Sequence, residues 1–276
     1  MLAAVLLAFR EGLEAALIVG IVLGALNKMG ARQRQRSVWL GVGLAAWLSF
    51  GVAVGLTFIG IELDGIAEQI FEGATMLIAA GVLTWMIFWM QYQGRRMKGE
   101  LEAEVRQALV GGAGWGLFGL SFIAVFREGV ETALLLTANA FNSSATDTLI
   151  GTLIGLALAV GAGWLLFATT VRLNTRQFFR VTSVVLIVFA AGLVAHGIHE
   201  FNEAGLIPEV VEHIWNTNGI VPQESQLGSV LTTLFGYNAM PSLTELLGYV
   251  TYFVVVWLGA RRLDQFMARR AVQAAS

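Results

Sequence analysis

Seven apolar stretches, each long enough to cross a lipid bilayer as a helix, limit what this chain can fold into. A transmembrane helix needs about 20 mostly apolar residues. Only 13% of the residues are charged, about half the share in a soluble protein, so a soluble enzyme is nearly excluded. The excess of apolar side chains also excludes a disordered chain. We therefore expect an all-α, polytopic membrane protein with seven transmembrane helices. The stretches are Leu2–Leu26, Val38–Ile61, Ile66–Met90, Trp115–Phe141, Thr148–Val171, Val181–Glu200 and Leu243–Ala260.

The positions of Lys and Arg predict the orientation. Of 17 such residues, 15 lie in the first, third and fifth connections or in the C-terminal tail, and none lies in the other connections. Cytoplasmic loops are enriched in Lys and Arg, so we expect the N-terminus outside and the C-terminus in the cytoplasm. The 15 residues are Lys28, Arg32, Arg34, Arg36, Arg95, Arg96, Lys98, Arg106, Arg172, Arg176, Arg180, Arg261, Arg262, Arg269 and Arg270.

Acidic and histidine residues gather on the opposite, outer side. All three Pro residues lie in the segment Phe201–Ser242, which we expect to be a long outer loop with short helices over 208–215 and 225–235. On the inner side, Arg95–Val110 has the apolar spacing of one further helix, which either lies on the cytoplasmic membrane surface or packs against its neighbours. The acidic residues expected outside include Glu62, Asp64, Asp147, Glu203, Glu209, Glu212 and Glu224.

One motif occurs twice and predicts an inverted repeat. Residues 10–17 read Arg-Glu-Gly-Leu-Glu-Ala-Ala-Leu, and residues 127–134 read Arg-Glu-Gly-Val-Glu-Thr-Ala-Leu. With seven spans, the two copies lie in helices that cross in opposite directions, as in many secondary transporters. We expect a single transmembrane domain over 1–276, with repeat one over about 1–90 and repeat two over about 115–200. An outer loop over about 201–242 and a seventh helix over about 243–260 follow.

The repeated motif places ionisable side chains inside two apolar spans. Helical geometry puts Arg10, Glu11 and Glu14 on one face, and Gly12 leaves room for a close helix approach. Each ionisable side chain near the bilayer centre costs about 2.5–3.5 kcal/mol or more, so six of them indicate a function. The second copy supplies Arg127, Glu128, Gly129 and Glu131.

Four carboxylates against two guanidinium groups leave a net negative charge that a cation or protons must balance. Carboxylate oxygens are hard ligands suited to Fe, Mn, Mg or Ca. We therefore interpret Glu11, Glu14, Glu128 and Glu131 as metal ligands and Arg10 and Arg127 as their charge balance. The alternative is that Arg and Glu pair within each motif and only hold two helices together.

A second group of candidate ligands lies near the outer mouth. Glu68 and Glu72 share one face of the third span, while His196, His199 and Glu200 share one face of the sixth. An outer mouth rich in carboxylates favours cations. The alternatives are hydrogen-bonding interfacial histidines and carboxylates that stabilise a helix start.

Glycine pairs with small-xxx-small spacing predict close helix packing. They are Gly20/Gly24, Gly51/Gly55 and Gly151/Gly155.

At the two Arg-Glu-Gly-x-Glu motifs the sequence resembles the high-affinity iron permeases of the oxidase-dependent iron transporter family, in its bacterial Efe-type branch. The resemblance extends to Phe71-Glu72-Gly73, the stretch 83–90, Ala190–Leu193, and Leu234–Tyr237 followed by Pro241 and Ser242. It implies a seven-helix permease with an outside N-terminus, whose motif carboxylates handle iron as Fe2+ or Fe3+. It also implies periplasmic iron-handling or oxidising partner proteins.

The leading hypothesis is thus an iron permease in the inner membrane, with iron as its substrate, no permanently bound cofactor and no nucleic-acid partner. A broader divalent-metal or proton-coupled cation transporter and a non-transporting membrane metal sensor stay open as alternatives. An intramembrane metalloenzyme is disfavoured, because the order His-x-x-His-Glu matches neither His-Glu-x-x-His nor His-x-x-Glu-His.

Overall fold

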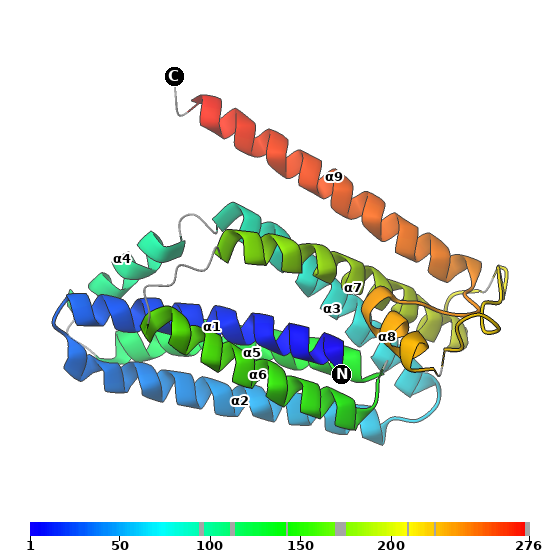
Figure 1. The fold of residues 1–276 in the computed structure, drawn as a ribbon, viewed down its shortest axis with the longest axis horizontal. Helices are drawn as coiled ribbons and strands as arrows, with labels where there is room; N and C mark the ends of the chain where they lie inside the picture. The colour runs from blue at the N-terminus through cyan, green and yellow to red at the C-terminus, as the bar shows by residue number, and fades with distance from the viewer. Residues whose placement is uncertain are drawn as a thin grey trace. The chain divides into compact units, whose positions relative to one another are not determined.

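A computed structural model describes residues 1–93, 97–110, 114–141, 143–168, 175–208, 210–223 and 225–273. Within these ranges it contains helices and no strand, which confirms the all-α class (Figure 1). Of the charged residues discussed above, Arg95, Arg96, Arg172, Glu209 and Glu224 lie outside the described residues. The elements are α1 (Leu2–Lys28), η1 (Arg32–Arg34), α2 (Gln35–Glu62), α3 (Ile66–Gln93), α4 (Met97–Val110), α5 (Gly114–Phe141), α6 (Ala145–Ala168), α7 (Thr175–Glu203), α8 (Gln226–Phe235) and α9 (Leu243–Gln273).

Five helical segments are long and apolar enough to cross a membrane. They are Arg32–Gly60, Ile66–Met90, Ala145–Leu165, Val181–Glu203 and Leu243–Arg262. The two other predicted spans fall in α1 and α5, which each carry one Arg and two Glu in mid-helix. These charges lower the apolar character of both helices, so the count of seven spans stays a prediction.

The predicted outer loop is only partly helical. The helix expected over 225–235 is confirmed as α8, whose first turn is capped by the Ser225 hydroxyl, which accepts a hydrogen bond from the Gly228 amide at 2.9 Å. The helix expected over 208–215 is wrong, since the described part of that segment forms bends and irregular backbone. There the Ile214 amide donates to the Pro241 carbonyl at 3.1 Å, so the backbone bonds across the loop and not along a helix.

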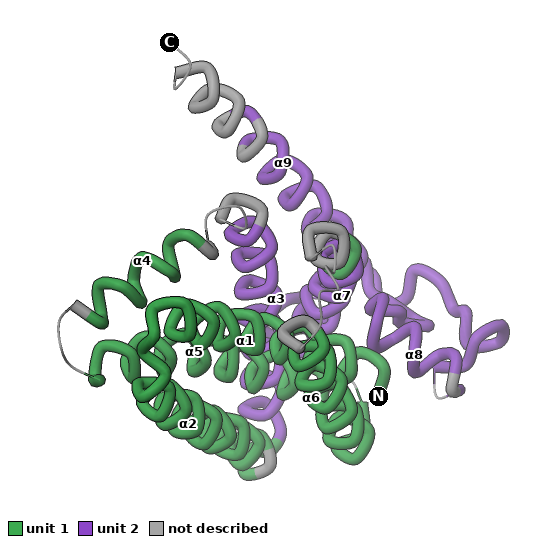
Figure 2. Tube along the Cα trace, turned by 60° about the vertical axis from the view of Figure 1, so that its left-hand side comes forward, with its two compact units in different colours: residues 1–64, 92–182 green, residues 65–91, 183–276 purple. Residues whose placement is uncertain are grey.

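The chain divides into two compact units, coloured separately in Figure 2. Unit 1 comprises residues 1–64 and 92–182, and unit 2 comprises residues 65–91 and 183–276. In unit 1, α1 packs along α6 and α2 packs along α5, while α1 also contacts α5. The close packing predicted for Gly151 and Gly155 is confirmed, because both face α1. That predicted for Gly24, Gly51 and Gly55 is wrong, because beyond the neighbouring residues of the same helix no described atom comes within 4 Å of the place where their Cβ atoms would be.

An apolar cluster closes unit 1 at the end where α4 lies. Six fully buried residues from four helices form it, and partly buried side chains surround them. Because α4 contributes Val105 to this cluster, the amphipathic spacing predicted for 95–110 is used to pack α4 against its neighbours. The six residues are Val22, Ala25, Leu26, Val38, Val105 and Leu117.

Unit 2 is held by a glycine crossing and by contacts along α9. A Cβ atom on Gly73 of α3 would lie 3.0 Å from the Gly197 carbonyl oxygen of α7, so the two backbones touch. Gly236 ends α8 with a φ of 67°, a conformation that favours glycine, and there its backbone meets Gly192. The Thr84 and Tyr252 hydroxyls lie 2.8 Å apart and join α3 to α9.

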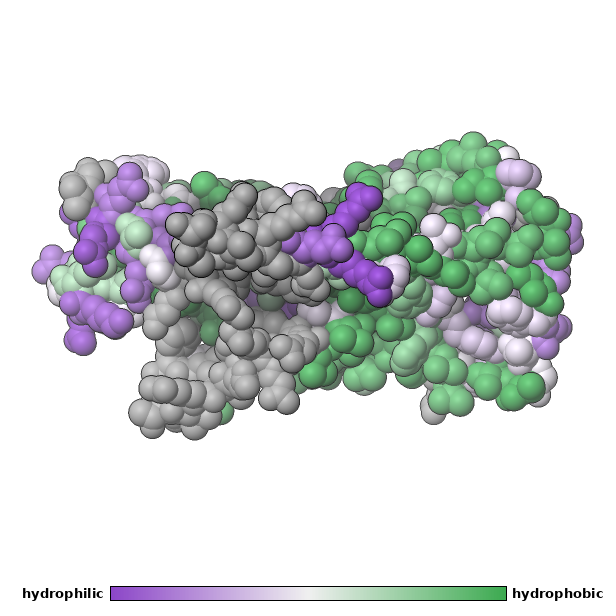
Figure 3. Space-filling model, turned by 90° about the horizontal axis from the view of Figure 1, so that it is seen from above, coloured by the Kyte–Doolittle hydropathy of each residue, from purple (hydrophilic) through white to green (hydrophobic). Residues whose placement is uncertain are grey.

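Large apolar side chains cover much of the described surface, as the green areas of Figure 3 show. On α2 and α6 alone, Trp47, Phe50, Phe58, Leu153 and Trp164 are more than half exposed. Patches of this extent do not occur on ordinary soluble monomers, and lipid is the solvent that suits them.

We expect Leu117→Ala to destabilise unit 1 far more than Ile123→Ala on the same helix. Leu117 is 1% exposed inside the apolar cluster, whereas Ile123 is 68% exposed. A cavity left by truncating a buried leucine costs about 2–5 kcal/mol. Thermal unfolding of the purified protein in one detergent checks this, and equal melting temperatures for the two variants would contradict it.

Candidate metal-binding site

The two motifs lie at the same level because α1 and α5 are antiparallel neighbours and each carries its motif near the middle of the helix. The C-terminal end of α1 lies beside α4, where Lys28 pairs with Glu102 at 3.6 Å. The N-terminal end of α5 also lies beside α4, since a Cβ on Gly116 would be 3.1 Å from that of Ala108. With α1 and α5 in contact, their mid-helix segments come together.

Within each motif the arginine pairs with both of its glutamates. Arg10 pairs with Glu11 and, through Nη2, lies 2.8 Å from Oε1 of Glu14. In the second copy, Arg127 Nη2 lies 3.0 Å from Oε1 of Glu128, and its Nε lies 3.3 Å from Oε1 of Glu131. The pairing follows from the helix, which places residues i and i+4 on one face.

The two arginines differ in their surroundings. The Arg10 side chain is 1% exposed, whereas that of Arg127 is 43% exposed. A buried guanidinium depends on its partners much more than an exposed one does. The repeat in sequence is therefore not an exact repeat in environment.

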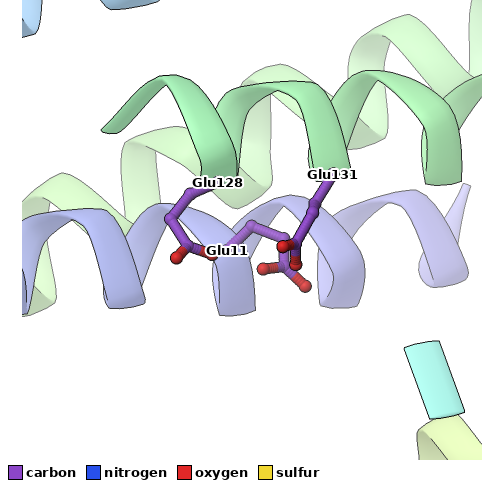
Figure 4. Close-up of side chains that lie close together, drawn as sticks. All are labelled: Glu11, Glu128 and Glu131. Atoms are coloured by element: carbon purple, nitrogen blue, oxygen red, sulfur yellow. The ribbon is translucent and has the colours of Figure 1, made fainter. Parts of the chain in front are cut away.

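Three carboxylates from the two motifs converge at the contact between α1 and α5 (Figure 4). Glu128 and Glu131 reach from α5 toward Glu11 of α1, and one oxygen from each lies within 4.8 Å of the others. In the part of the chain that the structure describes, the Oε2 atoms of all three are buried without a hydrogen-bond partner. Glu14 lies outside this group of three and pairs with Arg10.

This arrangement can bind a hard cation. Buried oxygen atoms without hydrogen bonds are costly, and a metal ion satisfies several of them at once. An all-oxygen ligand set of this kind suits Fe, Mn, Mg or Ca and is poor for soft Cu(I). We name Glu11, Glu128 and Glu131 the carboxylate triad.

The residues predicted at the outer mouth all lie in unit 2. Near the crossing of α3 and α7, Glu72 is close enough to Glu68, Glu200 and Glu203 for their charges to interact. Among the described residues, no group of three or more acidic or histidine ligand atoms besides the carboxylate triad lies within 4.8 Å of one another. The structure thus places these residues near each other without forming a compact ligand set.

The predicted histidines already have partners. His199 lies 3.0 Å from Oε1 of Glu245 through Nδ1 and 3.2 Å from Oε1 of Glu203 through Nε2. His196 Nδ1 lies 3.0 Å from the Gly192 carbonyl oxygen, so that nitrogen donates a hydrogen bond. The hydrogen-bonding alternative for both histidines thus has direct geometric support.

Glu245 is the residue at this mouth that sequence reasoning missed. Its Oε1 accepts from the Ser242 amide at 3.1 Å, while its own amide donates to the Ser242 hydroxyl at 3.2 Å. Its Oε2 accepts from the Asn238 side chain at 2.8 Å. The spacing Ser-x-x-Glu at the start of α9 is a capping box and could have identified this residue.

Comparison with known proteins finds one family and a set of close relatives. The sequence profile described as the iron permease FTR1 family matches residues 1–267. "Ferrous iron permease EfeU" of Escherichia coli O6:K15:H31 is 36% identical over 251 residues, which cover 90% of this chain and 91% of the relative. The protein of the same name from Yersinia pestis is 34% identical over 90% of this chain and 89% of the relative. "Putative inactive ferrous iron permease EfeU" of Escherichia coli K12 is 36% identical over 90% of this chain and 91% of the relative. No solved structure matches the chain.

We expect Arg10→Gln to destabilise the protein more than Arg127→Gln. Removing Arg10 leaves Glu11 and Glu14 buried without their cation, and breaking a buried ion pair costs about 3–5 kcal/mol. Arg127 is partly exposed, so its loss is better tolerated. The yield of folded protein and its melting temperature measure the effect, and equal loss in both variants would refute the difference in environment.

We expect the effects of His199→Ala and Glu245→Gln on stability to be strongly coupled. If His199 holds α7 to the start of α9 through Glu245, the second substitution costs little once the first is made. A double-mutant cycle on melting temperature tests this, with Glu212→Gln in the exposed loop as the control. Additive effects would show that the contact contributes nothing.

Proposed function

The chain belongs to the iron permease FTR1 family, and we propose that it carries ferrous iron into the cell through the carboxylates of its two Arg-Glu-Gly-x-Glu motifs. The family description and the names of the relatives indicate a transporter and not an enzyme. Together with the five candidate spans, they identify a multi-pass membrane protein. The ferrous state of the substrate is the one in the names of the relatives.

The observation that carries this proposal is the convergence of the carboxylate triad from two helices that are far apart in sequence. Glu11 comes from α1, and Glu128 and Glu131 come from α5. Their buried oxygen atoms are hard ligands, which accept Fe2+ along with other divalent metals. Ionisable side chains inside apolar membrane helices are costly and are functional candidates by default, which supports a role in transport for these six.

The arginines supply positive charge to the glutamates, so an arriving iron ion must compete with a guanidinium group for the carboxylate oxygens. Arg10 contacts both Glu11 and Glu14, so it offsets part of their repulsion and keeps Glu11 close to the other two carboxylates. An iron ion that binds the triad displaces the guanidinium from Glu11, while Glu14 retains it. The guanidinium then returns when the ion leaves, which keeps the site from holding its substrate too tightly.

We further propose that the chain is built as an inverted repeat, with the N-terminus outside and α4 on the cytoplasmic side of the inner membrane. The helix pairing supports this, because α1 with α6 and α5 with α2 are equivalent pairs under such a repeat. The third helix of each repeat, α3 or α7, contributes one glycine to the Gly73–Gly197 crossing. The Lys and Arg count supports the orientation.

At the outer mouth we propose that Glu68, Glu72 and Glu200 attract iron, with His196 and His199 as further candidate ligands. The shared negative charge around Glu72 supports an attracting role. Periplasmic iron-handling proteins are the partners that would deliver the ion there.

We expect Glu11→Gln, Glu14→Gln, Glu128→Gln and Glu131→Gln each to lower iron uptake at least about tenfold, since each removes a charge that acts on the ion. Uptake of radioactive Fe2+ under reducing conditions, and of Fe3+ separately, into proteoliposomes that contain this chain alone measures the effect. Glu104→Gln, on the exposed face of α4, is the matched control and should transport at the unmodified rate.

Wild-type uptake in all four motif variants would sink the carboxylate route. Equal competition by Mn2+, Zn2+ and Mg2+ would favour the broader cation transporter. Metal binding without any uptake would favour a sensor.

A further inference from the structure

We infer that Gly12 and Gly129, the glycines inside the two motifs, are positioning residues that set the distance between the carboxylates of the iron site. This inference rests on the proposed function, because it concerns the same site. Neither glycine has a side chain that could bind the ion. Each acts by fixing its motif helix against a helix of the other repeat.

At four successive contacts between α1, the first motif helix, and α6, a glycine of one helix faces an alanine of the other. Cβ atoms built on Gly151, Gly155 and Gly163 would lie 2.8–2.9 Å from the Cβ atoms of Ala4, Ala8 and Ala16, respectively. At the centre of this series, a Cβ on Gly12 would lie 2.8 Å from that of Ala159. Real Cβ atoms do not approach so closely, so α1 and α6 are tightly packed. The residue numbers of the contacting positions increase together along both helices, so the two helices are parallel.

The second motif helix is held to α2 in the same way. A Cβ on Gly114 would lie 2.8 Å from the Ser37 hydroxyl, and a Cβ on Gly129 would collide with the Ser49 side chain. Gly41 of α2 packs against Ser121 of α5 between these points. The residue numbers of the contacting positions again increase together along both helices, so α2 and α5 form a second parallel pair.

These contacts fix the carboxylates because the glycine and the glutamates lie on different faces of the same helix turn. At 3.6 residues per turn, Glu11 and Glu14 are about 100° and 160° away from Gly12 around the axis. When the glycine face lies against α6, the glutamate face is directed at α5. The same relation holds for Gly129, which faces α2 while Glu128 and Glu131 reach toward α1.

Close approach is not a general property of glycine in these helices. At Gly24 of α1 and Gly51 of α2, no described atom from elsewhere lies within 4 Å of a built Cβ. A methyl group at these two positions has room, whereas one at Gly12 or Gly129 must push the motif helix outward. Substitution of Gly24 or Gly51 by alanine is therefore a control, because it makes the same glycine-to-alanine change where the methyl group has room.

The experiment compares Gly129→Ala, Ser49→Gly and the double variant. We expect Gly129→Ala to raise the KM for Fe2+ uptake by about ten- to hundredfold, the cost of displacing reacting groups by about 1 Å. Ser49→Gly removes the atoms that the new methyl group meets, so the double variant should return to within about threefold of the unmodified KM. Gly12→Ala with Ala159→Gly is the equivalent test on α1, and Gly24→Ala and Gly51→Ala should leave the KM unchanged.

Three outcomes would overturn the inference. They are an unchanged KM in Gly129→Ala, a failure of Ser49→Gly to restore it, and a loss of folded protein in Gly129→Ala with the KM of the remainder unchanged. The last outcome would show a purely structural role.

Anaerobic Fe2+ binding to the detergent-purified variants separates this inference from the proposed function. If the unmodified protein binds Fe2+ but moves none, the proposed transport fails. The affinity in Gly129→Ala and its rescue by Ser49→Gly still test the positioning role.

Discussion

The pairing of buried charges between arginine and glutamate is the constraint on which the rest of this structure depends. Four glutamates and two arginines are tolerated in α1 and α5 because each arginine contacts both glutamates of its own helix. If all four glutamates are ionised, two negative charges remain for a cation or protons to balance. The helix pairing and the glycine contacts hold most of these side chains in the interior of unit 1, although Arg127 stays partly exposed.

Small residues make that placement possible. Without a hydrophobic driving force between helices in lipid, association depends on close packing and polar contacts. The α1–α6 and α2–α5 pairs use alanine, serine and glycine along their full contact, whereas the α1–α5 contact carries charged groups. Two well-packed helix pairs thus meet at a polar contact that carries the motif carboxylates.

The sequence predicted the helices well, because long apolar runs and the i, i+4 spacing depend only on local geometry. The pairing of Arg with Glu inside each motif, which the structure shows, was only the alternative to metal binding in the sequence. The sequence could not predict that Glu11 meets Glu128 and Glu131 more closely than Glu14 does, since that depends on how two distant helices pack. The two incorrect predictions, of close packing at Gly51 and of a helix over 208–215, also concern contacts between distant parts of the chain. Gly51 and Gly151 have equivalent spacing, yet only Gly151 has a neighbouring helix, and segment 208–215 pairs its backbone with residues close to α9.

Each of the two helix pairs in unit 1 joins helices that are synthesised at different times. Ribosomes deliver α1 and α2 to the membrane long before α6 and α5 exist, so the first motif waits in lipid without the helices that later enclose it. During that interval Glu11 and Glu14 have Arg10 on the same helix as their partner. An arginine inside each motif is thus useful before any ion is transported, because it makes a helix with two carboxylates acceptable to the insertion machinery on its own.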